Sequence, residues 1–244
     1  MNFAPVTGAG PADHLFVFVF AVAYPVAGVF GFRRLMRKIA AGHPVDRLHV
    51  YRNTMIGHWA LLVIALLLWW TAGRPWSGLG LYWSSEPAWE TALGAAFVVI
   101  AIAVLLRQLR EVGRTDARTL AKLRNRLGSL EAIVPRSPSE LRRFHAVSFT
   151  AGVVEELLWR GYLIWYLSQA WSLGVAALLS TVAFGIAHGY QGWRQVPSIT
   201  AVGAALTGLY LLTGTLWASI ALHIAIDVLQ GRLGYAITRE QARH

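Results

Sequence analysis

The apolar residues of this chain are gathered into runs of 17 or more positions, separated by polar or basic connections. An α-helix needs about 20 mainly apolar residues to cross the hydrocarbon core of a bilayer. Only 14% of the residues are charged, whereas a soluble domain usually carries about 25%. The pattern therefore predicts an all-α, polytopic transmembrane helix bundle of about seven spans. The expected spans are 14–32, 54–73, 89–106, 144–164, 172–189, 197–213 and 215–231.

Arg and Lys are concentrated in the connections that this arrangement places on one side of the membrane. The segments 33–53 and 107–143 are rich in basic residues, whereas 74–88 contains only Arg74. By the positive-inside rule, the N-terminus is predicted to lie outside and the C-terminus inside. The net charge of +10 then reflects membrane topology, and we expect no nucleic-acid partner.

The connection 107–143 has a helical pattern of its own. Leu120, Leu123, Leu127 and Leu130 are spaced by 3, 4 and 3 positions, with basic residues between them. This spacing predicts a basic amphipathic helix that lies on the anionic lipid surface of the cytoplasmic leaflet.

A helix start is encoded just before the fourth expected span, in the sequence SPSE. Ser137 can serve as the N-cap, Pro138 as the first helical residue and Glu140 as the glutamate of a capping box. We therefore expect the helix that contains this span to begin near Pro138.

Four ionisable residues lie deep within the apolar spans: Glu155, Glu156, Arg160 and Asp227. Each costs roughly 2.5–3.5 kcal/mol to place at the centre of a membrane helix. A leucine returns only about 0.3–0.6 kcal/mol on the same scale. Because the cost is high, a functional role is the first explanation to consider for such residues.

The two adjacent glutamates differ in their local partners. Glu156 and Arg160 are four residues apart, so they can pair along one face of the helix. Glu155 points about 100° away and has no partner of this kind on its own helix. We interpret Glu156 and Arg160 as a structural pair and Glu155 as a candidate general base. The alternative is that all three residues form one polar clamp between helices.

Two histidines complete the candidate set. His188 lies near the cytoplasmic end of the fifth expected span, where Gly185 and Gly189 form a small-xxx-small pair that lets another helix approach. His223 precedes Asp227 by one helical turn, so the carboxylate can orient the imidazole, or both side chains can face one substrate atom.

Other membrane histidines are interpreted more simply. His58 has no ionisable neighbour in its span, and His145 lies near the interface. Both are predicted to be hydrogen-bonding residues between helices, without a catalytic role.

Several chemistries fit these residues. Glu155 and His188 can activate a water while His223 stabilises an oxyanion, or the histidines and carboxylates can bind a divalent metal such as zinc. Buried charges also serve proton-coupled carriers. The chain has no cysteine and neither an HExxH nor a GxSxG motif, which excludes a thiolate nucleophile and the best-known zinc and serine hydrolase signatures.

Three motifs on three separate helices resemble those of the CPBP family of intramembrane proteases, which includes the type II CAAX prenyl endopeptidases and enzymes linked to bacteriocin processing. The family motif E-E-x-x-x-R is similar to residues 155–160, and F-x-x-x-H is similar to 184–188. The third motif, H-x-x-x-N or H-x-x-x-D, is similar to 223–227. The resemblance covers about residues 145–231.

The resemblance implies a role for each matching position. Glu155 would be the general base, assisted by His188, and His223 with Asp227 would stabilise the oxyanion or position the water. Glu156 and Arg160 would hold the motif helix, and Phe184 would support the second motif. Prenyl endopeptidases typically have asparagine at the position of Asp227, and an ionised aspartate cannot donate a hydrogen bond to an oxyanion. This difference leaves open a metal-binding set drawn from Glu155, His188, His223 and Asp227.

The resemblance also divides the chain. Residues 1–143 would be a variable N-terminal transmembrane region that includes the basic connection 107–143. Residues 144–231 would be the catalytic core, and 232–244 a cytoplasmic tail.

We therefore expect a glutamate- or metal-dependent intramembrane endopeptidase that hydrolyses membrane-associated proteins or peptides. The alternative is a non-proteolytic maturation or immunity scaffold, or a proton-coupled carrier. Arginine outnumbers lysine 20 to 2, which we interpret as the product of a GC-rich bacterial coding sequence. The expected location is the bacterial cytoplasmic (inner) membrane, with the site facing the cytoplasm.

Overall fold

A computed structural model describes residues 8–82, 89–112 and 117–241 of the chain. All regular structure in these residues is helical. The first helices are α1 (Pro11–Phe18), η1 (Val19–Ala23), α2 (Tyr24–Ala40), α3 (Arg47–Thr71), η2 (Trp76–Leu79), α4 (Trp89–Val112), α5 (Ala117–Leu127) and η3 (Gly128–Ile133). The remaining ones are α6 (Pro138–Glu155), η4 (Glu156–Leu163), α7 (Ile164–Leu167), α8 (Leu173–Ala187), η5 (His188–Gln191), α9 (Val196–Thr213) and α10 (Trp217–Gln241).

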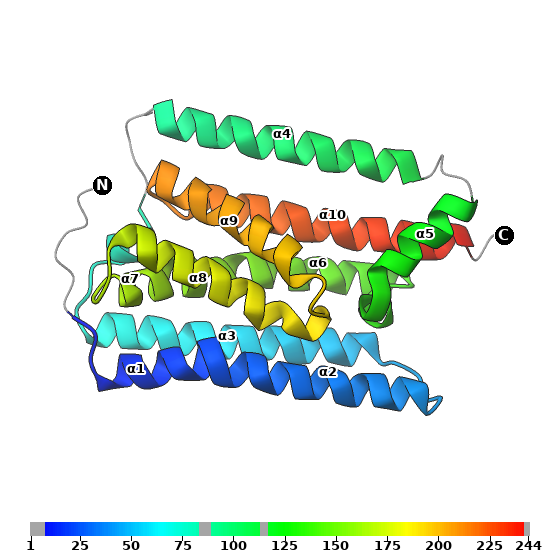
Figure 1. Ribbon diagram of the computed structural model, residues 1–244, viewed down its shortest axis with the longest axis horizontal. Helices are drawn as coiled ribbons and strands as arrows, with labels where there is room; N and C mark the ends of the chain where they lie inside the picture. The colour runs from blue at the N-terminus through cyan, green and yellow to red at the C-terminus, as the bar shows by residue number, and fades with distance from the viewer. Residues whose placement is uncertain (1–7, 83–88, 113–116, 242–244) are drawn as a thin grey trace.

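The long helices lie side by side along the length of the molecule (Figure 1). In this view α1, α2 and α3 form one edge and α4 the other, and α6, α8, α9 and α10 lie between them. The short α5 crosses one end of the bundle and packs against α10. The prediction of an all-α transmembrane bundle is confirmed.

Six helical stretches among the described residues are long and apolar enough to cross a membrane. They are Pro11–Ala40, Arg47–Thr71, Trp89–Val112, Leu173–Gln191, Val196–Thr213 and Trp217–Arg239. The expected span 144–164 lies within the uninterrupted helical stretch formed by α6, η4 and α7, whose charged residues make it less apolar than the others. The number of spans and their orientation remain predictions. The tail expected from residue 232 continues α10 as helix to Gln241.

The predicted start of α6 is confirmed. The Ser137 side chain accepts a hydrogen bond from the Glu140 backbone N–H at 3.2 Å, and Pro138 is the first helical residue. The Glu140 carboxylate accepts from the backbone N–H of Arg136 at 2.6 Å, one position before the cap. The first bond satisfies a backbone donor that a helix leaves free in its first turn, and the second satisfies the backbone donor just before the cap.

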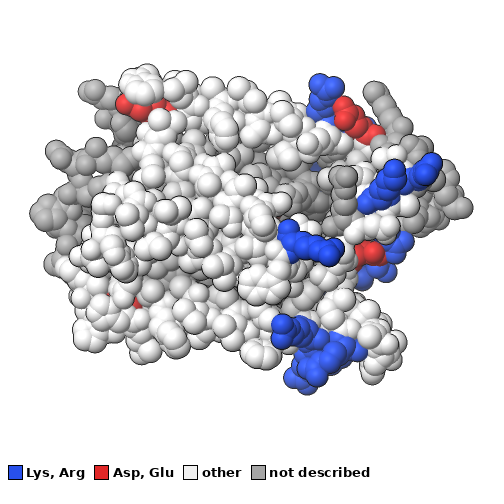
Figure 2. All heavy atoms as spheres, in the orientation of Figure 1, with Lys and Arg blue, Asp and Glu red and all other residues white. Residues whose placement is uncertain are grey.

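Basic side chains gather at one end of the visible face, where α5 lies (Figure 2). By the positive-inside rule this end is predicted to be cytoplasmic. The amphipathic helix expected in the connection 107–143 is present as α5, although residues 113–116 of that connection lie outside the described residues. Leu123 packs against Val112 and Ile237, so part of the apolar face of α5 contacts the bundle itself. Arg124 donates a hydrogen bond to the Glu131 carboxylate, which lowers the pKa of that group below its ordinary value.

The interior of the bundle is formed around the stretch 156–163. Every residue of η4 is buried, whereas α2 has no buried residue and α4 buries only Gly94 and Val112. Large apolar side chains are exposed on the outer helices, as expected where lipid is the solvent. The candidate motif 155–160 therefore lies within the best-packed part of the protein.

Small residues allow the inner helices to approach closely. A Cβ on Gly185 of α8 would lie 1.9 Å from the Thr200 Oγ1 of α9, and one on Gly152 of α6 would lie 2.4 Å from the Ile224 Cγ1 of α10. Gly185 therefore has the helix-packing role expected of it. Gly189 instead faces Trp193, within the connection that follows α8.

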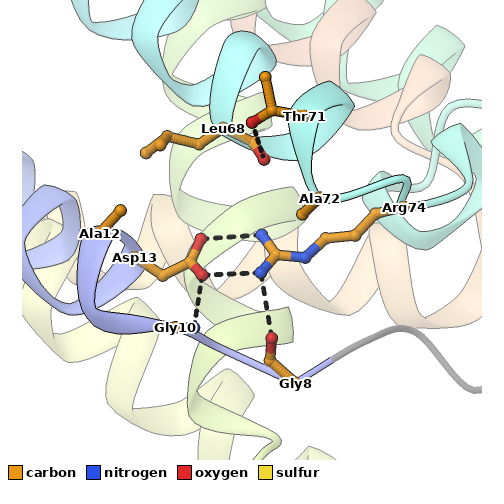
Figure 3. A pocket seen from close by; sticks show the side chains of 8 residues that line it. All are labelled: Gly8, Gly10, Ala12, Asp13, Leu68, Thr71, Ala72 and Arg74. Atoms are coloured by element: carbon orange, nitrogen blue, oxygen red, sulfur yellow. Dashed lines mark hydrogen bonds and ion pairs between the residues drawn. The ribbon is translucent and has the colours of Figure 1, made fainter.

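A second buried polar cluster joins the first helix to the end of α3 (Figure 3). The Arg74 guanidinium donates to both carboxylate oxygens of Asp13, at 2.8 and 2.7 Å, and to the Gly8 carbonyl at 3.1 Å. Tyr162 of η4 donates to the same carboxylate, and the Arg74 guanidinium lies 4.2 Å from the centre of the Trp165 ring. This cluster attaches α1 to the helix that carries the candidate site.

Candidate active site

The candidate motif coincides with a change of helix type. α6 ends at Glu155, and residues 156–163 form a π-helix, a conformation often found at functional sites. The Ser180 hydroxyl of α8 donates to the Trp159 carbonyl within this stretch at 2.6 Å. The wider helix is therefore supported by a neighbouring helix and not only by its own backbone.

Glu156 and Arg160 form the predicted pair, at 2.8 Å between Glu156 Oε1 and Arg160 Nη1. The guanidinium also donates to the Gly203 carbonyl at 3.0 Å and to the Thr207 hydroxyl at 3.3 Å. It lies over the Phe184 ring, 4.3 Å from the centroid. Because the pair is fully buried and has these further partners, it connects the motif helix to α8 and α9.

Glu156 also contacts the third motif. The Nδ1 of His223 lies 2.7 Å from Glu156 Oε1, so the imidazole donates to the carboxylate through this nitrogen. The other nitrogen, Nε2, lies 3.8 Å from Asp227 Oδ2, which places the expected histidine–aspartate pair at ion-pair distance. Glu156 therefore contacts His223 as well as Arg160, and the contact with His223 was not predicted from the spacing along one helix.

His188 is held by its own helix. Its Nδ1 donates to the Phe184 carbonyl at 2.8 Å, and its ring lies against the Phe184 ring with centroids 4.6 Å apart. In the neutral imidazole with this hydrogen bond, Nε2 carries a lone pair. That nitrogen lies 3.7 Å from Glu155 Oε2.

Glu155 is bound on one side only. Its Oε1 lies 3.0 Å from the Nε2 of His58 on α3. Its Oε2 is buried, has no hydrogen-bond partner among the described residues, and faces His188. Glu155 has no partner on its own helix, as expected, and its hydrogen-bond partner is instead His58 on α3.

His58 is predicted from the sequence to be a hydrogen-bonding histidine between helices, outside the candidate site. The hydrogen bond between helices is present, and its partner is Glu155, which the sequence did not indicate. The only available signal was a histidine in an otherwise apolar span. The other residue interpreted in this way, His145, has its Nε2 buried without a hydrogen-bond partner in the described part of the chain.

The structure brings the candidate residues together as two neighbouring groups. One comprises Glu155 with His58 and His188, and the other comprises Glu156 with Arg160, His223 and Asp227. The Phe184 ring lies against members of both groups, with its centroid 4.6 Å from that of His188 and 6.2 Å from that of His223. Within the described residues, no group of three or more His, Asp or Glu side chains has an arrangement that would hold a metal ion.

These observations define an all-helical membrane protein with carboxylates and histidines buried together among its helices. Residues 137–229 match the family model of the Rce1-like type II CAAX prenyl endopeptidases. The match begins at the N-cap of α6 and includes all three motifs, so this part of the chain is similar to the Rce1-like domain, consistent with a CPBP family protease. Searches of curated proteins and of solved structures gave no match.

Proposed function

We propose that this protein is an intramembrane endopeptidase that hydrolyses a peptide bond in a membrane-associated protein or peptide. The family match supports a protease of the CAAX type. The observation that carries the proposal is the unpartnered Oε2 of Glu155, buried and 3.7 Å from the Nε2 of His188. A water can contact both atoms at about 2.8 Å, an ordinary hydrogen-bond distance.

In this proposal Glu155 is the general base. Oε2 takes a proton from the water while His188 Nε2 accepts its second hydrogen bond, and the water oxygen attacks the scissile carbonyl carbon. The protonated carboxyl then gives its proton to the nitrogen of the leaving amine as the C–N bond breaks. One water is consumed, and one new carboxyl and one new amine are formed.

His223 would act on the oxygen of the tetrahedral intermediate. Its Nδ1 is engaged by Glu156, so only Nε2, on the Asp227 side, can face a substrate. A ring protonated at both nitrogens can donate to the oxyanion through Nε2, with its charge balanced by the neighbouring carboxylates. In this arrangement the hydrogen-bond donor is the histidine, Glu156 orients the ring through Nδ1, and the Asp227 carboxylate beside Nε2 favours the protonated ring.

A metal-dependent form of the same reaction remains a proposal. Glu155, His188, His223 and Asp227 have the types of oxygen and nitrogen donor that zinc uses, but no three of them are arranged in this structure to hold an ion, so they would have to move closer together to bind one. Metal analysis of the purified protein tests this, with His188→Ala as the comparison. Stoichiometric zinc that is lost in the variant would support the metal-dependent form, whereas a metal-free, active protein would support glutamate alone.

The position of the site supports access from the predicted cytoplasmic side of a bacterial inner membrane. His188 lies at the end of α8, and Ser129 of η3 donates to the Gln191 carbonyl three residues later, at 3.3 Å. The basic α5 directly precedes η3. We therefore propose that α5 holds an anionic lipid surface beside the site.

The proposal is tested with purified protein in proteoliposomes and two quenched fluorescent probes. One probe is a peptide that ends in a farnesylated C-a-a-X sequence, and the other is an unmodified transmembrane peptide. Glu155→Gln should reduce cleavage by about 10²–10⁴-fold, because a general base typically contributes this much. His188→Ala and His223→Ala should also abolish cleavage, whereas the exposed His49→Ala on α3 should not.

Three outcomes separate the alternatives. Full activity in Glu155→Gln would exclude the general-base role. An intact peptide crosslinked to Glu155→Gln and identified by mass spectrometry would support the protease. Ion-dependent transport by a wild-type protein that cleaves neither probe would favour a carrier instead.

A further inference from the structure

We propose that His58 is a positioning residue for Glu155: it holds one carboxylate oxygen so that the other faces His188. The inference rests on the proposed endopeptidase function and adds a residue from α3, outside the segment that matches the protease family. His58 lies 97 residues from Glu155 in the chain.

The contact between His58 and Glu155 is well formed and sheltered. Nε2 and Oε1 are 3.0 Å apart, and the two side chains are 15% and 13% exposed. The hydrogen bond occupies Oε1, and the unpartnered Oε2 is the oxygen that faces His188. The two histidines therefore approach different oxygens of one carboxylate, one from α3 and one from the end of α8.

The His58 ring is itself fixed on its other edge. Its Nδ1 lies 2.9 Å from the Thr54 carbonyl, one turn earlier on α3, and 3.3 Å from the Tyr24 hydroxyl of α2. Because a carbonyl and a carboxylate only accept hydrogen bonds, the ring donates to Thr54 through Nδ1 and to Glu155 through Nε2, and is therefore an imidazolium paired with the carboxylate. The ring therefore has little freedom to rotate, and its Nε2 stays directed at the carboxylate.

Gly57 makes room for this arrangement. A Cβ at this position would lie 2.5 Å from the Tyr24 hydroxyl oxygen, so any larger residue would displace the tyrosine. The Tyr24 and His58 rings meet edge to face, with centroids 5.9 Å apart. The packing of α2 on α3 therefore supports the histidine from behind.

A carboxylate with two equivalent oxygens needs such a partner if one oxygen is to have a defined direction. Without His58, the group can rotate about its terminal bond, and its orientation toward a water becomes variable. A misplacement of about 1 Å at a reacting group can reduce the rate by about 10²-fold. We therefore expect the loss of His58 to act on the chemical step and to leave substrate binding unchanged.

The test compares His58→Ala, His58→Gln and His49→Ala in proteoliposomes with whichever of the two probes the wild type cleaves. His58→Ala should lower kcat by about 10²-fold per folded molecule with KM unchanged. The amide nitrogen of His58→Gln can occupy the position of Nε2 and donate to Oε1, so this variant should recover at least about tenfold of the loss. His49→Ala removes an exposed histidine of the same helix that bonds to Arg52 and Asn53, and should behave as the wild type.

A purely structural role would give a different result. It would lower the yield of folded protein in both His58 variants without changing kcat per folded molecule, and that result would overturn the inference. Equal kcat values for His58→Ala and the wild type would overturn it too. A wild type that cleaves neither probe would instead overturn the proposed function.

The contact itself can be tested without activity. The chain contains no cysteine, so the double variant His58→Cys, Glu155→Cys carries the only two thiols. A short bis-methanethiosulfonate reagent should link them within one polypeptide. Failure to link them, with linkage of a neighbouring α3–α6 pair such as Trp59→Cys with Thr150→Cys, would show that His58 does not reach Glu155.

Discussion

Replacement of Arg160 by methionine should destabilise the protein more than replacement of any exposed arginine. The substitution keeps a long unbranched side chain but removes the charge that neutralises Glu156. It also removes the donors that contact the Gly203 carbonyl and the Thr207 hydroxyl. Glu156 would then keep only His223 as a hydrogen-bond partner for Oε1.

The expected magnitude follows from the burial of the pair. The side chains of Arg160 and Glu156 are 1% and 0% exposed. Removal of one partner of a buried ion pair typically costs about 3–5 kcal/mol, because the remaining charge is left uncompensated. Replacement of both partners often costs less, so the double variant Glu156→Gln, Arg160→Met should be more stable than Arg160→Met alone.

Arg107 and Glu111 provide a matched control. They are also four residues apart in one helix, with a distance of 2.9 Å, but their side chains are 82% and 58% exposed. Exposed pairs of this spacing contribute about 0.3–0.5 kcal/mol, so Arg107→Met should have little effect. Stability would be measured by reversible unfolding in mixed micelles as the fraction of sodium dodecyl sulphate is raised.

A comparison of Arg160→Met with Arg107→Met shows whether the stability lost on breaking an ion pair depends on the burial of that pair. A loss for Arg160→Met no larger than that for Arg107→Met would refute the argument that burial makes the pair important. A double variant less stable than either single variant would show that Glu156 and Arg160 contribute independently.

Two further predictions concern packing and the second buried pair. Gly185→Ala should lower the Tm, because its Cβ would lie 1.9 Å from the Thr200 Oγ1. Gly174→Ala in the same helix should leave the Tm unchanged, because no atom lies within 4 Å of its Cβ. Equal changes in Tm would contradict the close approach of α8 and α9. Asp13→Asn should lower the free energy of unfolding by about 3–5 kcal/mol, because Arg74 would keep its buried charge without a carboxylate. A change below about 1 kcal/mol in the same unfolding assay would show that this pair does not hold α1 in place.

The features that the sequence could predict lie within single helices. The pairing of Glu156 with Arg160 follows from the periodicity of the α-helix, and the start of α6 at Pro138 follows from its cap residues. The motif residues Glu155 and His188 could be identified because charged and polar residues are rare in apolar spans.

The features that the sequence could not predict join distant helices. His58 and Glu155 are separated by 97 residues, and Arg74 and Asp13 by 61. Periodicity describes which residues share one helix face, but it carries no information about which helix packs on that face. Arg74 was noted only as the single basic residue of its connection, and its carboxylate partner could not be inferred.

The π-helix 156–163 has a consequence for how the motif helix works at both of its ends. A π-turn contains one more residue than the α-helical turn that it replaces, and each α-helical residue advances the direction of the side chains by about 100°. The extra residue therefore changes the directions of the side chains from Ile164 onward relative to that of Glu155. The upstream part of the helix can aim its carboxylate at His58 and His188, while the downstream part aims Trp165 at the Arg74 cluster. In a uniform α-helix over the same stretch, the two ends would have a different relative rotation. If Glu155 then faced His58 and His188, Trp165 would no longer face Arg74.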